Sequence, residues 1–152
     1  MELLIPDFDG QLASARRRWS IQASKFCNHN IETVPRLYGK VRPGHTYECS
    51  LNILKEAKKL RSGMLTKSGF MVGVGETAEE IMTTLRDLRN NDVDIVTIGQ
   101  YLQPSDRQLK VERYVTPEEF QQFKVAADQL GFRHVESGPL VRSSYHAWSH
   151  VG

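Results

Sequence analysis

Apolar segments of two different periods alternate along the chain, and this alternation constrains the fold more than any other feature. Residues 93–98 are rich in β-branched side chains and predict a strand. The segment that begins at Thr77 instead repeats apolar residues every three or four positions, as on one face of a helix. Five strands are predicted in this way, at residues 2–5, 25–28, 65–72, 93–98 and 132–136. Because parallel strands need helical crossovers, the alternation favours an α/β fold with a parallel sheet.

Four helices are predicted between these strands. The first covers residues 12–23, and the second begins after a cap at Thr46. The third and fourth begin with capping boxes at Thr77 and Thr116, each with a glutamate three residues later. Residues 31–45 are rich in proline and glycine and predict a loop. With no repeat, linker or low-complexity tract, we interpret residues 1–152 as one domain.

The composition excludes several classes of function. The 20 basic and 18 acidic residues give a net charge of +2, so no polybasic nucleic-acid-binding arm is expected. No apolar run approaches the roughly 20 residues that cross a bilayer, so no membrane partner is expected either. The two cysteines, Cys27 and Cys49, are too few for a disulfide scaffold and suit a reducing compartment. No paired-cysteine or other metal-binding motif is present.

Polar and glycine residues collect just after the predicted strands, where parallel α/β folds place their ligand sites. Because side chains alternate along a strand end, Asn28 and Asn30 would point to one side of the sheet and His29 to the other. A polar loop is also what any strand-to-helix connection requires, so each cluster alone could be structural. The candidate cofactor-binding residues are Asn28, His29, Asn30, Glu32, Gly73, Gly75, Glu76, Gln100 and Tyr101.

Two of these clusters have competing interpretations. A glycine turn before a capped helix, as at Gly73 and Gly75, could hold a negative group with its backbone amides. It lacks the full phosphate-binding fingerprint, however, and a simple tight turn explains it equally well. A single histidine such as His29 is more often a hydrogen-bonded structural residue than a catalytic base.

Four stretches of the chain are more specific than their physical patterns, namely FCNHNIETVPRLY at 26–38, LTKSGFMVGVGET at 65–77, TIGQYLQPS at 97–105 and SGPLVRSSY at 137–145. In their order and spacing they resemble the lipoyl synthase family of radical S-adenosylmethionine enzymes. The resemblance covers residues 1–147 and corresponds to the C-terminal half of that family. It implies a parallel-strand partial (β/α) barrel of the TIM type. It also implies a reaction in which two sulfur atoms are inserted into a protein-bound octanoyl chain to form the lipoyl group.

The same resemblance implies cofactors, partners and a metal ligand. The complete enzyme uses two 4Fe-4S clusters and S-adenosylmethionine, and its partner is an octanoylated lipoyl carrier domain or H protein. Ser144, or alternatively Ser143, matches the serine that ligates the auxiliary cluster. The cluster cysteines of the family have no counterpart here, so we expect a missing N-terminal half to carry them. Cys27 takes the place of an apolar residue and is expected in the core.

This chain alone is therefore expected to hold no stable cluster and to be inactive. The family implies a cytoplasmic location, or the mitochondrial matrix in a eukaryote. The alternative interpretation is a non-catalytic α/β module that binds a lipoyl carrier protein or a nucleotide.

Overall fold

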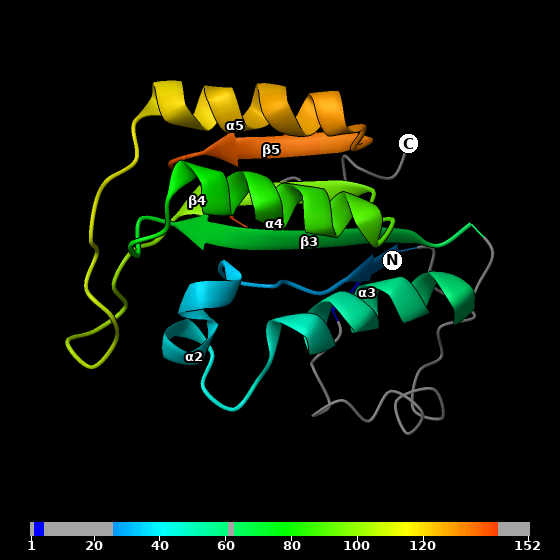
Figure 1. Ribbon diagram of the computed structural model, residues 1–152, viewed down its shortest axis with the longest axis horizontal. Helices are drawn as coiled ribbons and strands as arrows, with labels where there is room; N and C mark the ends of the chain where they lie inside the picture. The colour runs from blue at the N-terminus through cyan, green and yellow to red at the C-terminus, as the bar shows by residue number, and fades with distance from the viewer. Residues whose placement is uncertain (1, 5–25, 61–62, 143–152) are drawn as a thin grey trace.

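A five-stranded parallel sheet organises the part of the chain that the structure describes. The structure is a computed structural model that describes residues 2–4, 26–60 and 63–142 (Figure 1). The strands lie in the sheet in chain order, and β1 and β5 form its two edges. This arrangement confirms the predicted parallel α/β class. The strands are β1 Glu2–Leu4, β2 Phe26–Asn28, β3 Leu65–Val72, β4 Ile95–Gln100 and β5 His134–Gly138.

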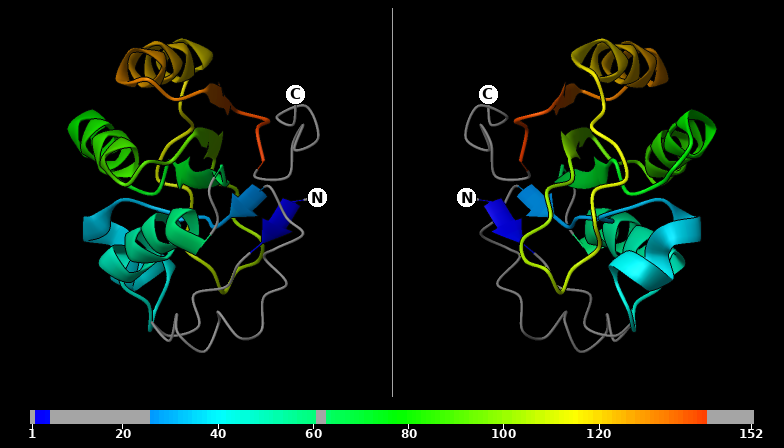
Figure 2. Two further views of the ribbon diagram at one scale, coloured as in Figure 1. Left: turned by 90° about the vertical axis from the view of Figure 1, so that its right-hand side faces the viewer. Right: turned by 90° about the vertical axis from the view of Figure 1, so that its left-hand side faces the viewer.

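The three long helices cover one face of the sheet. Viewed along the strands, the sheet curves and these helices lie on its outer side (Figure 2). The molecule is thus an open part of a TIM-type barrel, as the family resemblance implies. The helix predicted at residues 12–23 lies outside the described residues. The described helices are η3 Pro35–Leu37, α2 Tyr38–Val41, α3 Tyr47–Leu60, α4 Ala78–Asn90 and α5 Pro117–Leu130.

The main hydrophobic core fills the space between the sheet and the helices. Phe70 of β3 lies beside Ile98 of β4 in the parallel register, and both side chains are buried in this core. Removing such a side chain from water stabilises a fold by about 1.5–3 kcal/mol. The helical contribution includes the residues predicted for it, namely Leu54, Ile81, Leu85, Leu88, Phe120, Phe123 and Ala127. Cys27 is 1 % exposed, as expected for a core residue.

The predicted N-terminal caps of three helices are confirmed. The Thr77 hydroxyl accepts the Glu80 amide at 3.1 Å, and the Glu80 carboxylate accepts the Thr77 amide at 2.9 Å. Thr116 and Glu119 form the same reciprocal pair at the start of α5. The Thr46 hydroxyl accepts the Cys49 amide at 3.2 Å. These caps work because the first amides of a helix have no partner within it.

Several predicted boundaries were wrong. Residues 31–45 are not all loop, because a proline at the first position lets η3 begin and α2 follows it directly. β4 begins two residues later than predicted, since the Asp94 carboxylate instead accepts the Thr66 amide at 2.9 Å and pairs with Lys58 at 2.8 Å. β4 then runs on to Gln100, and β5 covers His134–Gly138 beside it instead of the predicted 132–136.

Candidate functional site

A cavity of about 100 Å³ lies at the carboxyl ends of β2, β3 and β4. It opens on the face of the sheet opposite the helices, because Gly69 and Thr97 alternate with the core residues Phe70 and Ile98. Its lining consists of Asn30, Glu32, Gly69, Phe70, Met71, Thr97, Gly99, Val141 and Arg142. The ends of three strands and the segment after β5 therefore converge on one concave site.

Two glycines keep this cavity open. A Cβ atom at Gly69 would collide with the Thr97 hydroxyl and lie 3.2 Å from Asn30 Oδ1. A Cβ atom at Gly99 would collide with the Val141 carbonyl oxygen and lie 3.4 Å from the Arg142 guanidinium. Any side chain at either position would therefore occupy space that a ligand could use.

The segment that follows β2 contains buried side-chain oxygens without a hydrogen-bond partner in the described part of the chain. Asn30 Oδ1 and Thr33 Oγ1 are buried, and neither has a hydrogen-bond partner in the described part of the chain. A buried polar atom without a partner costs about 1–3 kcal/mol. Asn30 also lines the cavity, so a ligand with a donor group placed there would satisfy its oxygen.

Glu32 is held in a backbone conformation that side chains disfavour. Its φ angle is +72°, in the left-handed region. The sheet enforces this, because the Glu32 amide donates to Gly69 O at 3.1 Å and its carbonyl accepts the Met71 amide at 3.0 Å. Burial raises the pKa of the Glu32 carboxyl, and the charge of Arg42 partly opposes that rise. Strained backbone of this kind concentrates at functional sites.

Asn28 and His29 lie deeper in the fold. They are 3 % and 2 % exposed, and the cavity lining includes neither of them. Asn28 pairs in register with Lys67, two residues before the cavity-lining Gly69. The alternation that continues from β2 therefore places Asn28 and Asn30 on the cavity side of the sheet and His29 on the helix side. The sequence predicted that they lie on opposite sides, but not which side faces the cavity.

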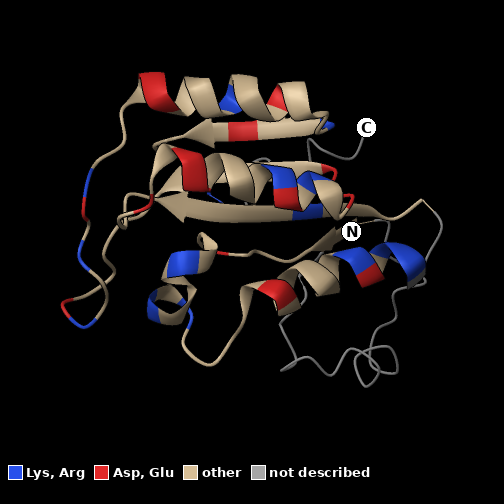
Figure 3. Cartoon of the chain, in the orientation of Figure 1, with Lys and Arg blue, Asp and Glu red and all other residues tan. Residues whose placement is uncertain are grey.

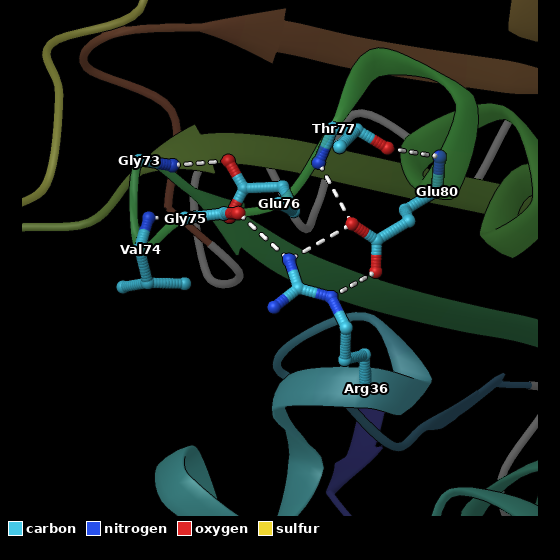
Figure 4. Close-up of polar contacts among 7 residues, drawn as sticks. All are labelled: Arg36, Gly73, Val74, Gly75, Glu76, Thr77 and Glu80. Atoms are coloured by element: carbon cyan, nitrogen blue, oxygen red, sulfur yellow. Dashed lines mark hydrogen bonds and ion pairs between the residues drawn. The ribbon is translucent and has the colours of Figure 1, made fainter.

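The glycine turn after β3 is closed by the chain itself. Glu76 Oε1 accepts the Gly73 amide at 2.6 Å, and Oε2 accepts the Val74 amide at 3.1 Å (Figure 4). Gly73 and Gly75 have φ angles of +102° and +112°, which side chains disfavour. The carboxylate of Glu76 thus occupies these two amides, which agrees with the interpretation of this segment as a tight strand-to-helix turn.

Arg36 fastens the same turn to the helical segment after β2. Its guanidinium donates to Gly75 O at 2.8 Å and makes two 3.0 Å bonds to the Glu80 carboxylate (Figure 4). The hydrogen bond from Arg36 is the main cause that lowers the pKa of Glu80. Sequence reasoning did not single out Arg36. Its position between Pro35 and the buried Leu37, at the start of a helix, is the signal that was available.

Gln100 and Tyr101 both hold the long loop that follows β4. The Gln100 side chain donates to the Tyr101 and Arg113 carbonyls at 3.0 Å and accepts the Val115 amide at 2.8 Å. The Tyr101 hydroxyl donates to Leu109 O at 2.6 Å. Neither residue lines the cavity, so the structure gives both a direct role in fixing this loop.

The described residues offer no grouped metal ligands. No three His, Cys, Asp or Glu side chains within residues 2–4, 26–60 and 63–142 are placed to hold a metal ion. Burial raises the pKa of the Cys27 thiol to about 12, so it stays protonated and is a poor ligand. Ser143 and Ser144 lie outside the described residues. None of the described helices is long and apolar enough to cross a bilayer.

Parallel strands, helices on the outer face and a cavity of mixed polar and apolar lining at the carboxyl ends define an α/β part-barrel of the kind that binds ligands at its mouth. No protein-family model matches the chain. Over 147 residues, 97 % of its length, it is 55 % identical to the lipoyl synthase of Hydrogenovibrio crunogenus. It is 56 % identical over the same length to those of Rubrobacter xylanophilus and Pelodictyon phaeoclathratiforme. The chain therefore belongs to the lipoyl synthase family, and it spans 46–49 % of the length of these three relatives.

Proposed function

We propose that this chain is the C-terminal half of a lipoyl synthase. Joined to the missing half, it takes part in inserting two sulfur atoms into an octanoyl chain carried on a lysine of a lipoyl carrier domain or H protein. The observation that carries the proposal is identity of 53–56 % to lipoyl synthases over nearly the whole chain. The cavity at the strand ends supports it, because that is where a barrel enzyme binds its ligands.

We assign part of the S-adenosylmethionine site to this cavity. Asn30 Oδ1 and the Glu32 carboxyl can accept from the hydroxyl and amino groups of that ligand, and Arg142 can donate to its carboxylate. When S-adenosylmethionine is bound, it would supply the radical that activates the octanoyl chain. Because small-molecule sites have volumes of about 300–1,000 Å³, this cavity would hold only part of the ligand. We assign the remaining contacts to neighbouring surfaces and to the missing half.

The iron–sulfur clusters do not fit the described residues, which group no metal ligands and bury Cys27 as a thiol. We therefore assign the cluster thiolates to the missing half. Ser144, or alternatively Ser143, supplies one hydroxyl oxygen to the auxiliary cluster in this proposal. An oxygen ligand is unusual on iron that is otherwise bound by thiolates, and it suits a position that has to exchange. The isolated chain then holds no stable cluster and is inactive.

The test uses the full-length protein that contains this chain, purified without oxygen and given S-adenosylmethionine, a reductant and an octanoyl-lysine peptide. We expect both 5′-deoxyadenosine and lipoyl product. Deoxyadenosine without any sulfur-containing product would contradict the proposed reaction. Specific binding of the carrier or of a nucleotide with neither product would favour the non-catalytic module instead.

Substitution of the two serines separates their roles. We expect Ser144→Ala to abolish lipoyl formation while deoxyadenosine formation continues, since only the auxiliary cluster loses a ligand. Ser143→Ala should have a smaller effect and serves as the matched control. The reversed order of effects would move the assignment to Ser143, and normal lipoyl formation by both variants would remove it from this motif.

A further inference from the structure

A buried polar cluster joins α2 and α3 next to the segment that lines the cavity. The hydroxyl oxygens of Tyr38 in α2 and Ser50 in α3 lie 2.7 Å apart, and both residues are buried. One guanidinium nitrogen of Arg42 donates to both, at 3.3 Å to Tyr38 and 3.4 Å to Ser50. Figure 3 shows that the segment of η3 and α2 carries basic residues and runs into the start of α3. Two helices therefore hold one arginine side chain.

The same nitrogen of Arg42 reaches the segment after β2. It donates to the Asn30 carbonyl at 3.4 Å, and Asn30 is the residue whose unpaired side-chain oxygen lies in the cavity lining. From the other side, the amides of Ile31 and Glu32 both donate to Gly69 O of β3 at 3.1 Å. The cavity-lining segment is thus held on one side by the sheet and on the other by Arg42.

This segment needs such a hold. Glu32 has a φ angle of +72°, and strained backbone persists only where the surrounding structure fixes it. Arg42 also places a positive charge near the buried Glu32 carboxyl, which opposes the rise of its pKa. An arginine side chain has many rotamers, so it takes one position only where partners fix it. Tyr38 can fix it because its own ring is packed edge-on against Tyr47, with centroids 5.9 Å apart.

We propose that Tyr38 and Ser50 are positioning residues for the S-adenosylmethionine site. Their hydroxyls fix the Arg42 guanidinium, and the guanidinium fixes the backbone at Asn30, so that the Asn30 side-chain oxygen keeps its place in the cavity wall. The cavity lining includes neither Tyr38 nor Ser50, so both act through Arg42. The identity of the ligand rests on the proposed function, whereas the hold on the segment does not.

Tyr47 offers a matched control for Tyr38. The two residues are 5 % and 4 % exposed, and their rings stack on each other in the main core. The Tyr47 hydroxyl donates to the Asp87 carboxylate of α4 at 2.8 Å. Substitution by phenylalanine removes one hydrogen-bonded hydroxyl from the same pair of rings in either case, but only Tyr38→Phe releases Arg42. A purely structural role therefore predicts the same kind of effect for both substitutions.

The first measurement needs no ligand. Hydrogen exchange of the full-length protein should show the Ile31 and Glu32 amides exchanging about fivefold faster in Tyr38→Phe, relative to the amides of β4. Tyr47→Phe should leave this ratio unchanged. It should nevertheless lower the urea midpoint at least as much, because the Asp87 carboxylate loses a hydrogen bond. An unchanged ratio in Tyr38→Phe, or an equal change in both variants, would overturn the proposal.

The second measurement is S-adenosylmethionine binding to the full-length protein, purified without oxygen, by calorimetry. We expect Tyr38→Phe and Ser50→Ala each to weaken binding about fivefold, and Tyr47→Phe to leave it unchanged. In an Arg42→Gln background, Tyr38→Phe should have no further effect, because both changes remove the same hold. An equal loss in both backgrounds would contradict the role of Arg42.

The two measurements separate failure of the inference from failure of the proposed function. If the unmodified protein binds S-adenosylmethionine and Tyr38→Phe binds it equally well, the positioning role fails and the proposed function stands. If the unmodified protein binds none, the proposed function fails, and hydrogen exchange alone decides whether Tyr38 holds the segment after β2.

Discussion

The segments that follow β2 and β3 lie side by side and differ in how they use their polar groups. After β3, the amides of Gly73 and Val74 are both taken by Glu76, and Arg36 fastens the turn from outside. After β2, the Asn30 amide oxygen is buried without a partner in the described residues, and Glu32 keeps a strained φ of +72°. The polar groups of the turn after β3 are thus paired with other groups of the chain, whereas the Asn30 oxygen after β2 has no partner among the described residues.

This difference separates a structural turn from a ligand site. Both segments are polar and rich in turn residues, so their composition does not distinguish them. A buried acceptor without a partner and a strained backbone do distinguish them, because both cost free energy of folding and neither stabilises the fold. Substitutions in the closed turn should therefore change stability, and those in the open segment should change ligand binding.

The largest expected effect is on the closed turn. A Cβ atom at Gly73 would collide with the Gln100 side chain and the Arg113 carbonyl, at a φ of +102°. We expect Gly73→Ala to lower the free energy of unfolding by about 2–4 kcal/mol, measured by urea denaturation. Gly39→Ala is the control, since a Cβ atom there would have no neighbour within 4 Å and alanine favours a helix. A loss of similar size at both glycines would show that the turn is not specifically constrained.

The next effect concerns binding. Asn30→Ala removes the unpaired acceptor of the cavity and should weaken S-adenosylmethionine binding to the full-length protein about tenfold, as calorimetry would show. Its free energy of unfolding should change by less than about 1 kcal/mol, because no described partner of Oδ1 is lost. Asn52→Ala, on the exposed side of α3, should change neither quantity. Unaltered affinity in Asn30→Ala would break the distinction between the two segments.

The strain at Glu32 should be measurable as a gain in stability. Glycine accepts a φ of +72° without strain, so Glu32→Gly should raise the free energy of unfolding by about 1 kcal/mol while it weakens ligand binding. Asp92 has a φ of +61° far from the cavity, and Asp92→Gly should gain stability without any effect on binding. A destabilised Glu32→Gly variant would mean that the side chain is needed for folding.

The smallest effect depends on pH. Arg36 lowers the pKa of Glu80, so their pairing stabilises the fold above the ordinary carboxyl pKa and is lost as pH falls through the lowered value. We expect Arg36→Gln to lower the urea midpoint only slightly at pH 7, because Arg36 is exposed, and not at all once Glu80 is protonated. Lys124→Gln, which removes an exposed pair with Asp128, is the control. An equal cost of Arg36→Gln in acid would show that its bond to Gly75 O, and not the ion pair, stabilises the turn.

Features that depend only on residues close together in the sequence were predicted well. The capping boxes at Thr77 and Thr116 need only residues three positions apart, and both form as expected. Alternation alone also predicts that His29 and Asn30 lie on opposite sides of the sheet. The helical turns at 35–41 were missed because proline and glycine usually indicate a loop, whereas Pro35 takes the first helical position, where proline is tolerated.

Positions set by distant partners could not be predicted. The contact of Glu76 with two amides depends on the backbone path of the turn, and that of Arg36 on the approach of η3 to α4. Gln100 was expected just past a strand, but β4 extends to include it beside Val72. It has the same parity as the core residues Val96 and Ile98, which was the available sign that it faces the helices.

The order of the strands also has a consequence for how the molecule is made. Because each strand of the described sheet pairs with its neighbours in the chain, a growing polypeptide meets its partner strand already present. Synthesis can then add one strand and one helix at a time, with β5 arriving last at the free side of β4. No described strand has to be inserted between two others, which removes a common source of kinetic traps in parallel sheets.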